Sequence, residues 1–129
     1  MVYNSIVGGV NLIYLEYYKT SRGDNPVKEY ILKIDSLDEV ADIMETLDTV
    51  DLVGASYLIS GGEDTRTLGN GLWEIKKSKH RFYYVYCLGN RVYMLHACYK
   101  QKGKAEKNDI DTGKKRMKEI LAQEKGKSQ

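Results

Sequence analysis

Residues that could act on a phosphodiester are concentrated between positions 81 and 100. Two tyrosine-rich apolar segments there are interrupted by Arg81, His96 and Lys100. The guanidinium fork of an arginine matches the nonbridging oxygens of a phosphate, an imidazole transfers protons near neutral pH, and a lysine stabilises developing negative charge. Cleavage of RNA by its own 2′-hydroxyl needs a base, an acid and such cations around the phosphorane. The segment therefore fits metal-free cleavage of a phosphodiester.

The elements that must position these residues are two strands, expected at 81–88 and 91–99 and joined by Gly89-Asn90. If that turn has two residues, Tyr83 lies opposite His96 and Arg81 lies opposite Cys98. Alternation then gives one face to Arg81, Tyr83, Val85, Met94, His96, Cys98 and Lys100, and the other to Phe82, Tyr84, Tyr86, Tyr93, Leu95 and Tyr99. A three-residue turn with a bulge would shift this pairing by one residue. The convergence of the cations thus depends on the register.

Each of these residues also has a purely structural explanation. A lone histidine in an apolar segment, such as His96, is typical of a half-buried core histidine. Arg81 could pair with Glu74 across the sheet. The lysines that follow the hairpin are typical of a solvated charge run, and most of the eleven tyrosines are typical of packing in the core and at its rim.

The N-terminal half predicts one strand and two helices. The strand is expected at 12–18, which is dense in β-favouring residues. Asn25 followed by Pro26 is typical of the start of a short helix. Ser36 with Glu39 three residues later is a capping box, and helical spacing of apolar residues continues to about position 50.

The C-terminal half predicts three strands and a helix. The glycine-rich region 54–71 predicts a long mobile connection with a short extended piece at 57–59. A strand at 72–77 precedes the hairpin, and a basic helix is expected from about Asn108, with fraying after Gln123. The order β-α-α-β-β-β-α predicts an α+β fold, in which the helices pack on one face of a small, mostly antiparallel sheet.

Length and composition limit the classes of protein that fit. The 129 residues suit one domain over 1–129 with a disordered tail from about 124. The apolar runs are too short to cross a bilayer and the N-terminus lacks a signal-peptide pattern, so we expect no membrane partner and a cytoplasmic location. Neither the two cysteines nor the two histidines show a short metal-binding spacing, so we expect no metal and no cofactor.

Charge is distributed unevenly along the chain. Residues 1–70 contain 5 Lys and Arg against 12 Asp and Glu, a balance of −7. Residues 71–129 contain 15 against 6, a balance of +9. A basic half of this kind can collect phosphate groups, although any single lysine in it is more typical of a solvated surface.

Five segments of the chain, taken in order, resemble the phage-type HigB toxins of the RelE superfamily. They are Gly23-Asp-Asn-Pro26-Val-Lys-Glu-Tyr30, Gly71-Leu-Trp-Glu-Ile-Lys76, Arg81-Phe-Tyr-Tyr84, Met94-Leu-His-Ala-Cys-Tyr-Lys100-Gln101 and Asp109-Ile-Asp-Thr-Gly-Lys-Lys-Arg116. The chain differs from the family pattern at Lys76, Cys98, Gln101 and Gly113, where the pattern has Arg, Phe, Lys and Ala. The spacing from Arg81 to His96 is also about one residue longer than is usual there.

The resemblance implies a RelE-like fold and the toxin of a type II toxin–antitoxin system. Such a toxin is an endoribonuclease that cuts messenger RNA on the ribosome and is neutralised, in a hetero-oligomer, by a cognate helix-turn-helix antitoxin. The residues it assigns to catalysis are Arg81, Tyr84, His96 and Lys100, and those to RNA binding are Arg66, Lys76, Lys77, Lys79, Lys102 and Lys104. Two other functions stay open, namely a non-catalytic toxin of the ParE type that blocks a topoisomerase and a nucleic-acid-binding phage or plasmid adaptor.

Overall fold

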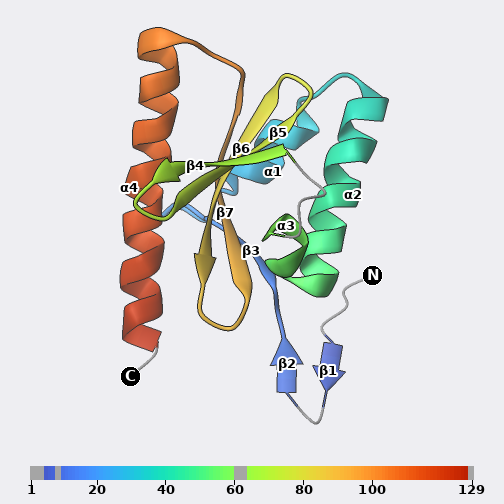
Figure 1. Ribbon diagram of the computed structural model, residues 1–129, viewed down its shortest axis with the longest axis vertical. Helices are drawn as coiled ribbons and strands as arrows, with labels where there is room; N and C mark the ends of the chain where they lie inside the picture. Colours follow the sequence, from blue (N-terminus) through green and yellow to red (C-terminus); the bar gives the residue numbers. More distant parts are fainter. Residues whose placement is uncertain (1–4, 8–9, 60–63, 128–129) are drawn as a thin grey trace.

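The computed structural model describes residues 5–7, 10–59 and 64–127, with side chains for 13–59 and 64–126. Its elements in chain order are β1 (Ser5–Val7), β2 (Val10–Leu12), β3 (Leu15–Tyr17), α1 (Pro26–Leu32), α2 (Leu37–Val53), α3 (Ser56–Ile59), β4 (Asp64–Gly69), β5 (Leu72–Lys77), β6 (His80–Cys87), β7 (Arg91–Tyr99) and α4 (Gly103–Lys127). Five strands form a mixed sheet in the order β3-β7-β6-β5-β4, and β1 pairs with β2 separately (Figure 1). The predicted α+β class is confirmed.

Local sequence signals set the starts of the first two helices. The Asn25 side chain accepts a hydrogen bond from the Lys28 backbone N–H at 3.2 Å, and Pro26 occupies the first position of α1. The Ser36 hydroxyl oxygen accepts from the Glu39 backbone N–H, also at 3.2 Å, before α2. Both predicted helix starts are therefore confirmed.

Elements at the edges of the sheet differ from the prediction. Within the strand expected at 12–18, only β3 joins the main sheet, where it runs parallel to β7. The extended piece expected at 57–59 belongs to the short helix α3. The connection expected to be mobile contains β4, which pairs antiparallel with β5, while residues 60–63 lie outside the described residues. Pairing with another strand sets the bounds of both edge strands, with the distant β7 for β3 and the adjacent β5 for β4.

Helix α4 is longer than predicted at both ends. It begins at Gly103 instead of about Asn108 and continues past Gln123 to Lys127. At its C-terminal end, Glu124 accepts hydrogen bonds from the Arg91 guanidinium and the Tyr93 hydroxyl. These contacts with β7 hold the last turns of the helix against the sheet, which explains why it does not end at the predicted position.

Helices cover both faces of the main sheet, whereas the sequence predicted that they share one face. Helices α1, α2 and α3 lie on one side and α4 lies on the other (Figure 1). The first layer buries Val27, Ile31, Ile43, Leu47, Val50, Leu58, Ile75, Phe82, Tyr84, Val92 and Met94. The second buries Tyr18, Leu72, Tyr83, Val85, Tyr93, Leu95, Cys98, Met117 and Ile120. Because the central strands are apolar on both sides, one layer of helices cannot cover them.

The hairpin of β6 and β7 contains both features that the sequence left open, a three-residue turn and a bulge. The turn comprises residues 88–90. The pairing then shifts by one residue between Tyr83 and Tyr84, and this shift compensates for the extra turn residue. Beyond the bulge the pairs are those predicted, Tyr83 with His96 and Arg81 with Cys98.

The bulge changes which side chains of β7 share a face. Leu95 packs in the cluster under α4, and the next residue, His96, also points to α4, where it contacts Asp109. Met94 packs on the opposite face with α1 and α2. The sequence predicted instead that Met94 shares a face with His96, because side chains alternate strictly in a hairpin without a bulge. Tyr93 and Leu95 are likewise on the α4 face rather than opposite it. Two consecutive residues on one side are the expected result of a bulge.

Helix α4 approaches the sheet closely at Gly113. A Cβ atom at this position would lie 2.9 Å from Cδ2 of the buried Tyr83 ring and 3.4 Å from a methyl group of Leu72. Real Cβ atoms do not come so close to an aromatic carbon, and the ring is fixed by its surroundings. Glycine at 113 therefore sets the distance between α4 and β6.

Gly113→Ala is expected to lower the free energy of unfolding by about 1–3 kcal/mol, because α4 or Tyr83 must move to accept the methyl group. Denaturant unfolding measures the change. The matched control is Gly126→Ala, in the same helix but with nothing within 4 Å of the added Cβ. It should leave stability unchanged or raise it by at most about 1 kcal/mol. Equal effects of the two substitutions would contradict close packing at Gly113.

None of the helices in the described part of the chain is long and apolar enough to span a bilayer.

Candidate active site

A cleft of about 220 Å³ lies on the α4 side of the sheet, where β5 and β7 end, β6 begins and α4 starts. We call it the central cleft. It is lined by Arg66, Glu74, Lys76, Arg81, Tyr83, Cys98, Lys100, Gln101, Glu106 and Asp109. Four strands and one helix thus contribute to a single surface around four cationic and three carboxylate side chains.

Strand pairing places the cations of the cleft beside one another. Lys76 pairs with Arg81 across β5 and β6, and Arg81 pairs with Cys98 across β6 and β7. Lys100 follows Cys98 by two residues, so that alternation keeps it on the same face. The cations converge as the predicted register implies.

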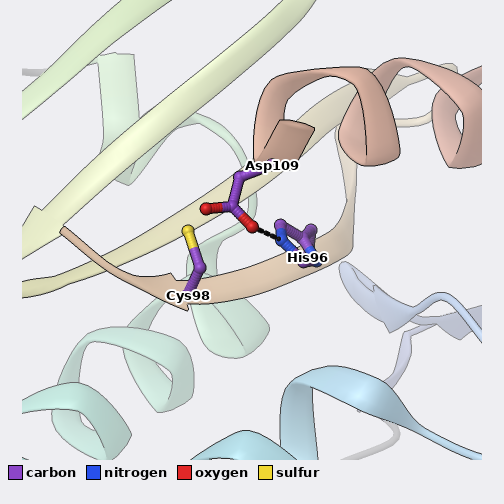
Figure 2. Close-up of side chains that lie close together, drawn as sticks. All are labelled: His96, Cys98 and Asp109. Atoms are coloured by element: carbon purple, nitrogen blue, oxygen red, sulfur yellow. Dashed lines mark hydrogen bonds and ion pairs between the residues drawn. The ribbon is translucent and has the colours of Figure 1, made fainter. Parts of the chain in front are cut away.

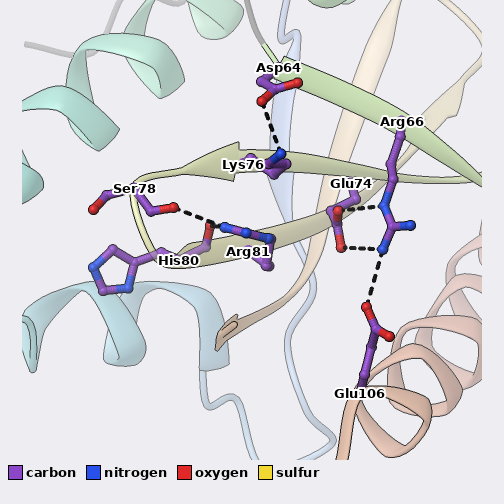
Figure 3. A network of polar contacts seen from close by, with 8 residues as sticks. All are labelled: Asp64, Arg66, Glu74, Lys76, Ser78, His80, Arg81 and Glu106. Carbon is purple, nitrogen blue, oxygen red and sulfur yellow. Dashed lines mark hydrogen bonds and ion pairs between the residues drawn. The ribbon is translucent and has the colours of Figure 1, made fainter. Parts of the chain in front are cut away.

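The turn between β5 and β6 orients the Arg81 guanidinium. Its Nη1 donates to the carbonyl oxygens of Ser78 and His80, at 3.0 and 2.9 Å (Figure 3). Among the described residues, no group accepts a hydrogen bond from Nε or Nη2 of Arg81. These nitrogens remain available to an anion in the cleft, because a guanidinium has five N–H donors.

The alternative pairing of Arg81 with Glu74 does not form, because Glu74 pairs with Arg66 instead. The Glu74 side chain is 2% exposed, and its Oε1 lies 2.8 Å from Arg66 Nε. The same guanidinium reaches Glu106 of α4, with 3.2 Å between Nη2 and Oε2 (Figure 3). The hydrogen bond with Glu74 is the largest of the effects that raise the pKa of Arg66. Arg66 therefore compensates a buried carboxylate and ties β4 and β5 to α4.

Arg66→Met is expected to lower the free energy of unfolding by about 2 kcal/mol, because it leaves the Glu74 carboxylate buried without its cation. Thermal or denaturant unfolding measures the loss. The double variant Arg66→Met with Glu74→Gln removes the stranded charge as well, so it should recover most of the stability. A double variant no more stable than the single one would show that burial of the charge is not the cause.

His96 is held between β7 and α4 by two contacts. Its Nε2 lies 2.9 Å from Asp109 Oδ1, and Arg116 Nη1 lies 3.3 Å from its Nδ1. A guanidinium can only donate, so Nδ1 accepts and Nε2 carries the proton that is shared with Asp109. Burial lowers the pKa of His96; Asp109 acts to raise it and Arg116 to lower it. His96 is therefore a neutral imidazole at neutral pH, with a defined tautomer.

Cys98 lies beside this pair, and the three side chains of His96, Cys98 and Asp109 point toward one another (Figure 2). Burial raises the pKa of the Cys98 thiol to about 12, and the Asp109 carboxylate acts in the same direction. The group is therefore a thiol at neutral pH. A thiol of this kind is a poor nucleophile, since the thiolate is the reactive form.

The structure divides the predicted site residues into three groups. Those that line the central cleft are Arg66, Lys76, Arg81 and Lys100, with His96 beside it. Tyr84 is completely buried on the opposite face of the sheet, with its hydroxyl 3.5 Å from that of Tyr86, and does not reach the cleft. Lys77 also lies on that face, 3.4 Å from Asp42 of α2.

The third group comprises lysines around the rim. Lys79 is exposed in the turn before β6, and Lys102 and Lys104 are exposed where α4 begins. None of these three lines the cleft. Their positions suit contacts with an extended polyanion that passes over the cleft, rather than contacts with the reacting phosphate.

Sequence reasoning did not assign the residues that α4 contributes. Glu106 and Asp109 are three residues apart, and Arg116 follows Asp109 by seven, so all three lie on one face of the helix. That spacing was visible in the sequence. The predicted helix contained Asp109 and Arg116 but began after Glu106, so the sequence could place only two of the three on one helix face.

The family comparison covers the part of the chain that forms the central cleft. Residues 33–118 match the model of a family described as Phage derived protein Gp49-like (DUF891). No curated protein matches the chain. The matched region contains every residue that lines the central cleft and most of α4. Since it also spans more than half of the 129 residues, the chain belongs to the phage-derived Gp49-like family, a family of RelE/HigB-like toxins.

Proposed function

We propose that the protein is the HigB-like toxin of a type II toxin–antitoxin system, an endoribonuclease that cleaves ribosome-bound messenger RNA in the cytoplasm. The observation that carries the proposal is the row of three cations, Lys76, Arg81 and Lys100, along one side of an open cleft. A phosphodiester is the substrate group that such a row fits best. Membership of a toxin family supports the same function.

The reaction needs only groups that the cleft supplies. The 2′-oxygen of the RNA forms a bond to phosphorus, and the bond from phosphorus to the 5′-oxygen breaks, which leaves a 2′,3′-cyclic phosphate and a 5′-hydroxyl. Arg81 and Lys100 stabilise the additional charge on the nonbridging oxygens. Asp109 lines the cleft and accepts the Nε2 hydrogen of His96, so these two residues act as one proton-transfer pair. The pair takes the 2′-hydroxyl proton and returns a proton to the 5′-oxygen.

Binding of the rest of the message depends on the rim. Lys76 forms an ion pair with the exposed Asp64 at 3.2 Å, which a phosphate group can replace. Lys79, Lys102 and Lys104 add phosphate contacts around the opening. Such contacts position RNA without reading its sequence and weaken as salt rises. Arg66 and Lys77 contribute less, because carboxylates of this chain already engage them.

We further propose that a cognate helix-turn-helix antitoxin binds the toxin in a hetero-oligomer and covers this surface. An acidic or apolar segment over the central cleft or along the basic helix α4 would occupy the positions that RNA phosphates need.

The test is cleavage of message on purified ribosomes, with analysis of the new RNA ends. The expected product carries a 2′,3′-cyclic phosphate and appears without added divalent cations beyond those that keep the ribosome intact. Folded protein that binds ribosomes and yields no such end would contradict the proposal.

A non-catalytic toxin of the ParE type is the second candidate, and one observation favours it. The four cations of the cleft, Arg66, Lys76, Arg81 and Lys100, are offset by the carboxylates Glu74, Glu106 and Asp109, so that the lining has a net charge of 4 − 3 = +1. This value is modest for a surface that binds RNA. Inhibition of a purified topoisomerase, with no cleavage of message, would select this candidate.

A further inference from the structure

Three side chains of different chemistry meet at the junction of β7 and α4. His96 and Cys98 are two residues apart on β7, so they share a face, and Asp109 lies opposite them on the second turn of α4. One potential ligand atom from each residue lies within 4.8 Å of the other two. Their spacing along the chain gave no sign of a metal site, because the third residue comes from a helix that packs over the strand.

We propose that His96, Cys98 and Asp109 bind a zinc ion. Imidazole nitrogen, thiolate sulfur and carboxylate oxygen are the three ligand types that Zn²⁺ takes from proteins. The thiolate and the imidazole disfavour Mg²⁺ and Ca²⁺, which prefer oxygen ligands. Three protein ligands leave one tetrahedral position open, and it faces the central cleft, since Cys98 and Asp109 both line that cleft. Zinc would occupy the atoms of His96 and Asp109 that the proposed proton-transfer pair uses, so the zinc-bound form would not cleave RNA by that route, but zinc binding is measured without any cleavage.

The existing geometry is close to what zinc requires. In a tetrahedral site the ligand atoms lie about 3.5 Å apart, which follows from bond lengths of about 2.0–2.3 Å. Here Nε2 of His96 and Oδ1 of Asp109 are 2.9 Å apart, and all three ligand atoms are within 4.8 Å. The separation that a tetrahedral site requires lies between these two distances.

Proton and charge balance are also satisfied. The Cys98 thiol releases its proton to solvent, and the His96 proton moves from Nε2 to Nδ1. One thiolate and one carboxylate then neutralise the divalent ion, so the loaded site has no net charge, one unit more positive than the empty site with its single Asp109 carboxylate. Arg116 must give up its contact with His96 Nδ1, which becomes a donor, but it keeps the Leu95 carbonyl oxygen at 3.0 Å. Arg116 is thus the residue that opposes binding.

The experiment uses untagged full-length protein, freed of metal under reducing conditions, with Zn²⁺ alone as the probe. Competition against a chromophoric chelator should give one equivalent bound, and the melting temperature should rise with zinc concentration. Co²⁺ in place of Zn²⁺ should give a charge-transfer band from sulfur to cobalt, which a site without the thiolate cannot produce.

Variants locate the site. Cys98→Ser and Asp109→Asn should each lower the zinc affinity strongly, because each removes a metal ligand. The expected loss is larger than the roughly tenfold to hundredfold loss of affinity caused by changing a group that only supports a ligand. Cys87→Ser is the matched control, because Cys87 is the other free cysteine and lies at the far end of the hairpin; its affinity should equal that of the parent. Arg116→Gln should bind zinc more tightly.

Three results would overturn the proposal. They are absence of binding to the parent protein in the chelator competition, a cobalt complex of the parent without the sulfur band, and equal affinity of Cys98→Ser and the parent. Because the cobalt spectrum is recorded on the parent protein, a variant that fails to fold does not prevent a decision. Cleavage of RNA is not a readout, so failure of the ribonuclease proposal would leave this result unaffected.

Discussion

Replacing Arg81 with alanine is expected to slow cleavage of ribosome-bound message about a hundredfold, since loss of one such electrostatic contact costs roughly 3 kcal/mol in the transition state. Arg81 pairs with residues of the site on both neighbouring strands and has donors that no described protein group engages. Its own hydrogen bonds go only to two backbone carbonyl oxygens around the turn, so the fold should persist. Single-turnover cleavage together with thermal unfolding measures both effects.

The matched control for this substitution is Arg22→Ala. Arg22 is exposed in the turn before α1 and does not line the central cleft, but its loss changes the net charge equally. It should cut at the parent rate. If Arg81→Ala also folds, binds ribosomes and cuts at the parent rate, Arg81 takes no part in catalysis.

His96→Gln is expected to slow cleavage about a hundredfold or more, which is the usual contribution of a positioned proton-transfer group. The glutamine amide can still donate to Asp109, so the melting temperature should stay close to that of the parent. Glutamine cannot transfer a proton, and the loss should therefore appear in the chemical step. The measurement is single-turnover cleavage with a zinc-selective chelator present, so that zinc at His96 does not contribute.

His80 supplies the contrasting control. It is buried on the opposite face, where Nδ1 lies 2.7 Å from the Tyr30 hydroxyl and Nε2 lies 2.6 Å from Glu39 Oε1. His80→Gln should lower the melting temperature and leave cleavage by the folded protein unchanged. If His96→Gln behaves in the same way, His96 is a structural residue, and proton transfer moves to Tyr83 and the lysines.

The parts of the fold that could be predicted are those defined by neighbouring residues. The caps at Asn25 and Ser36 use contacts three residues apart, and the central hairpin follows from two apolar segments around a glycine. The edge strand β3 lies within the strand predicted from β-favouring residues, whereas β4 depends on its pairing with β5, and nothing local distinguished it from loop. The sequence did contain a signal that helices cover both faces of the sheet. The residues from Phe82 to Val85 are apolar without interruption, so side chains on both faces of β6 are buried.

For the site, too, the residues that could be placed from the sequence are those on the predicted hairpin. Its cations lie on strands whose pairing the hairpin determines, and Arg81 and Lys100 were found in this way. Glu106 could not be placed, because it belongs to the start of α4, which the prediction missed; Asp109 lay within the predicted helix, but nothing in the sequence placed that helix over β7. Tyr84 was assigned from the family pattern, but the neighbouring Tyr83 is the tyrosine that lines the cleft. Alternation along β6 separates these two adjacent residues onto opposite faces.

The bulge in β7 has a consequence for how the chain tolerates insertions and deletions. It lies between the turn at 88–90 and the pairs that form the cleft, and it offsets the third residue of the turn. A two-residue turn without the bulge would give the same pairing of Arg81 with Cys98, so the length of the turn can change without moving the site. A loop grafted at 88–90 should be accepted for the same reason. Deleting Ala97, beyond the bulge, would instead turn Cys98 and Lys100 to the opposite face and remove them from the cleft.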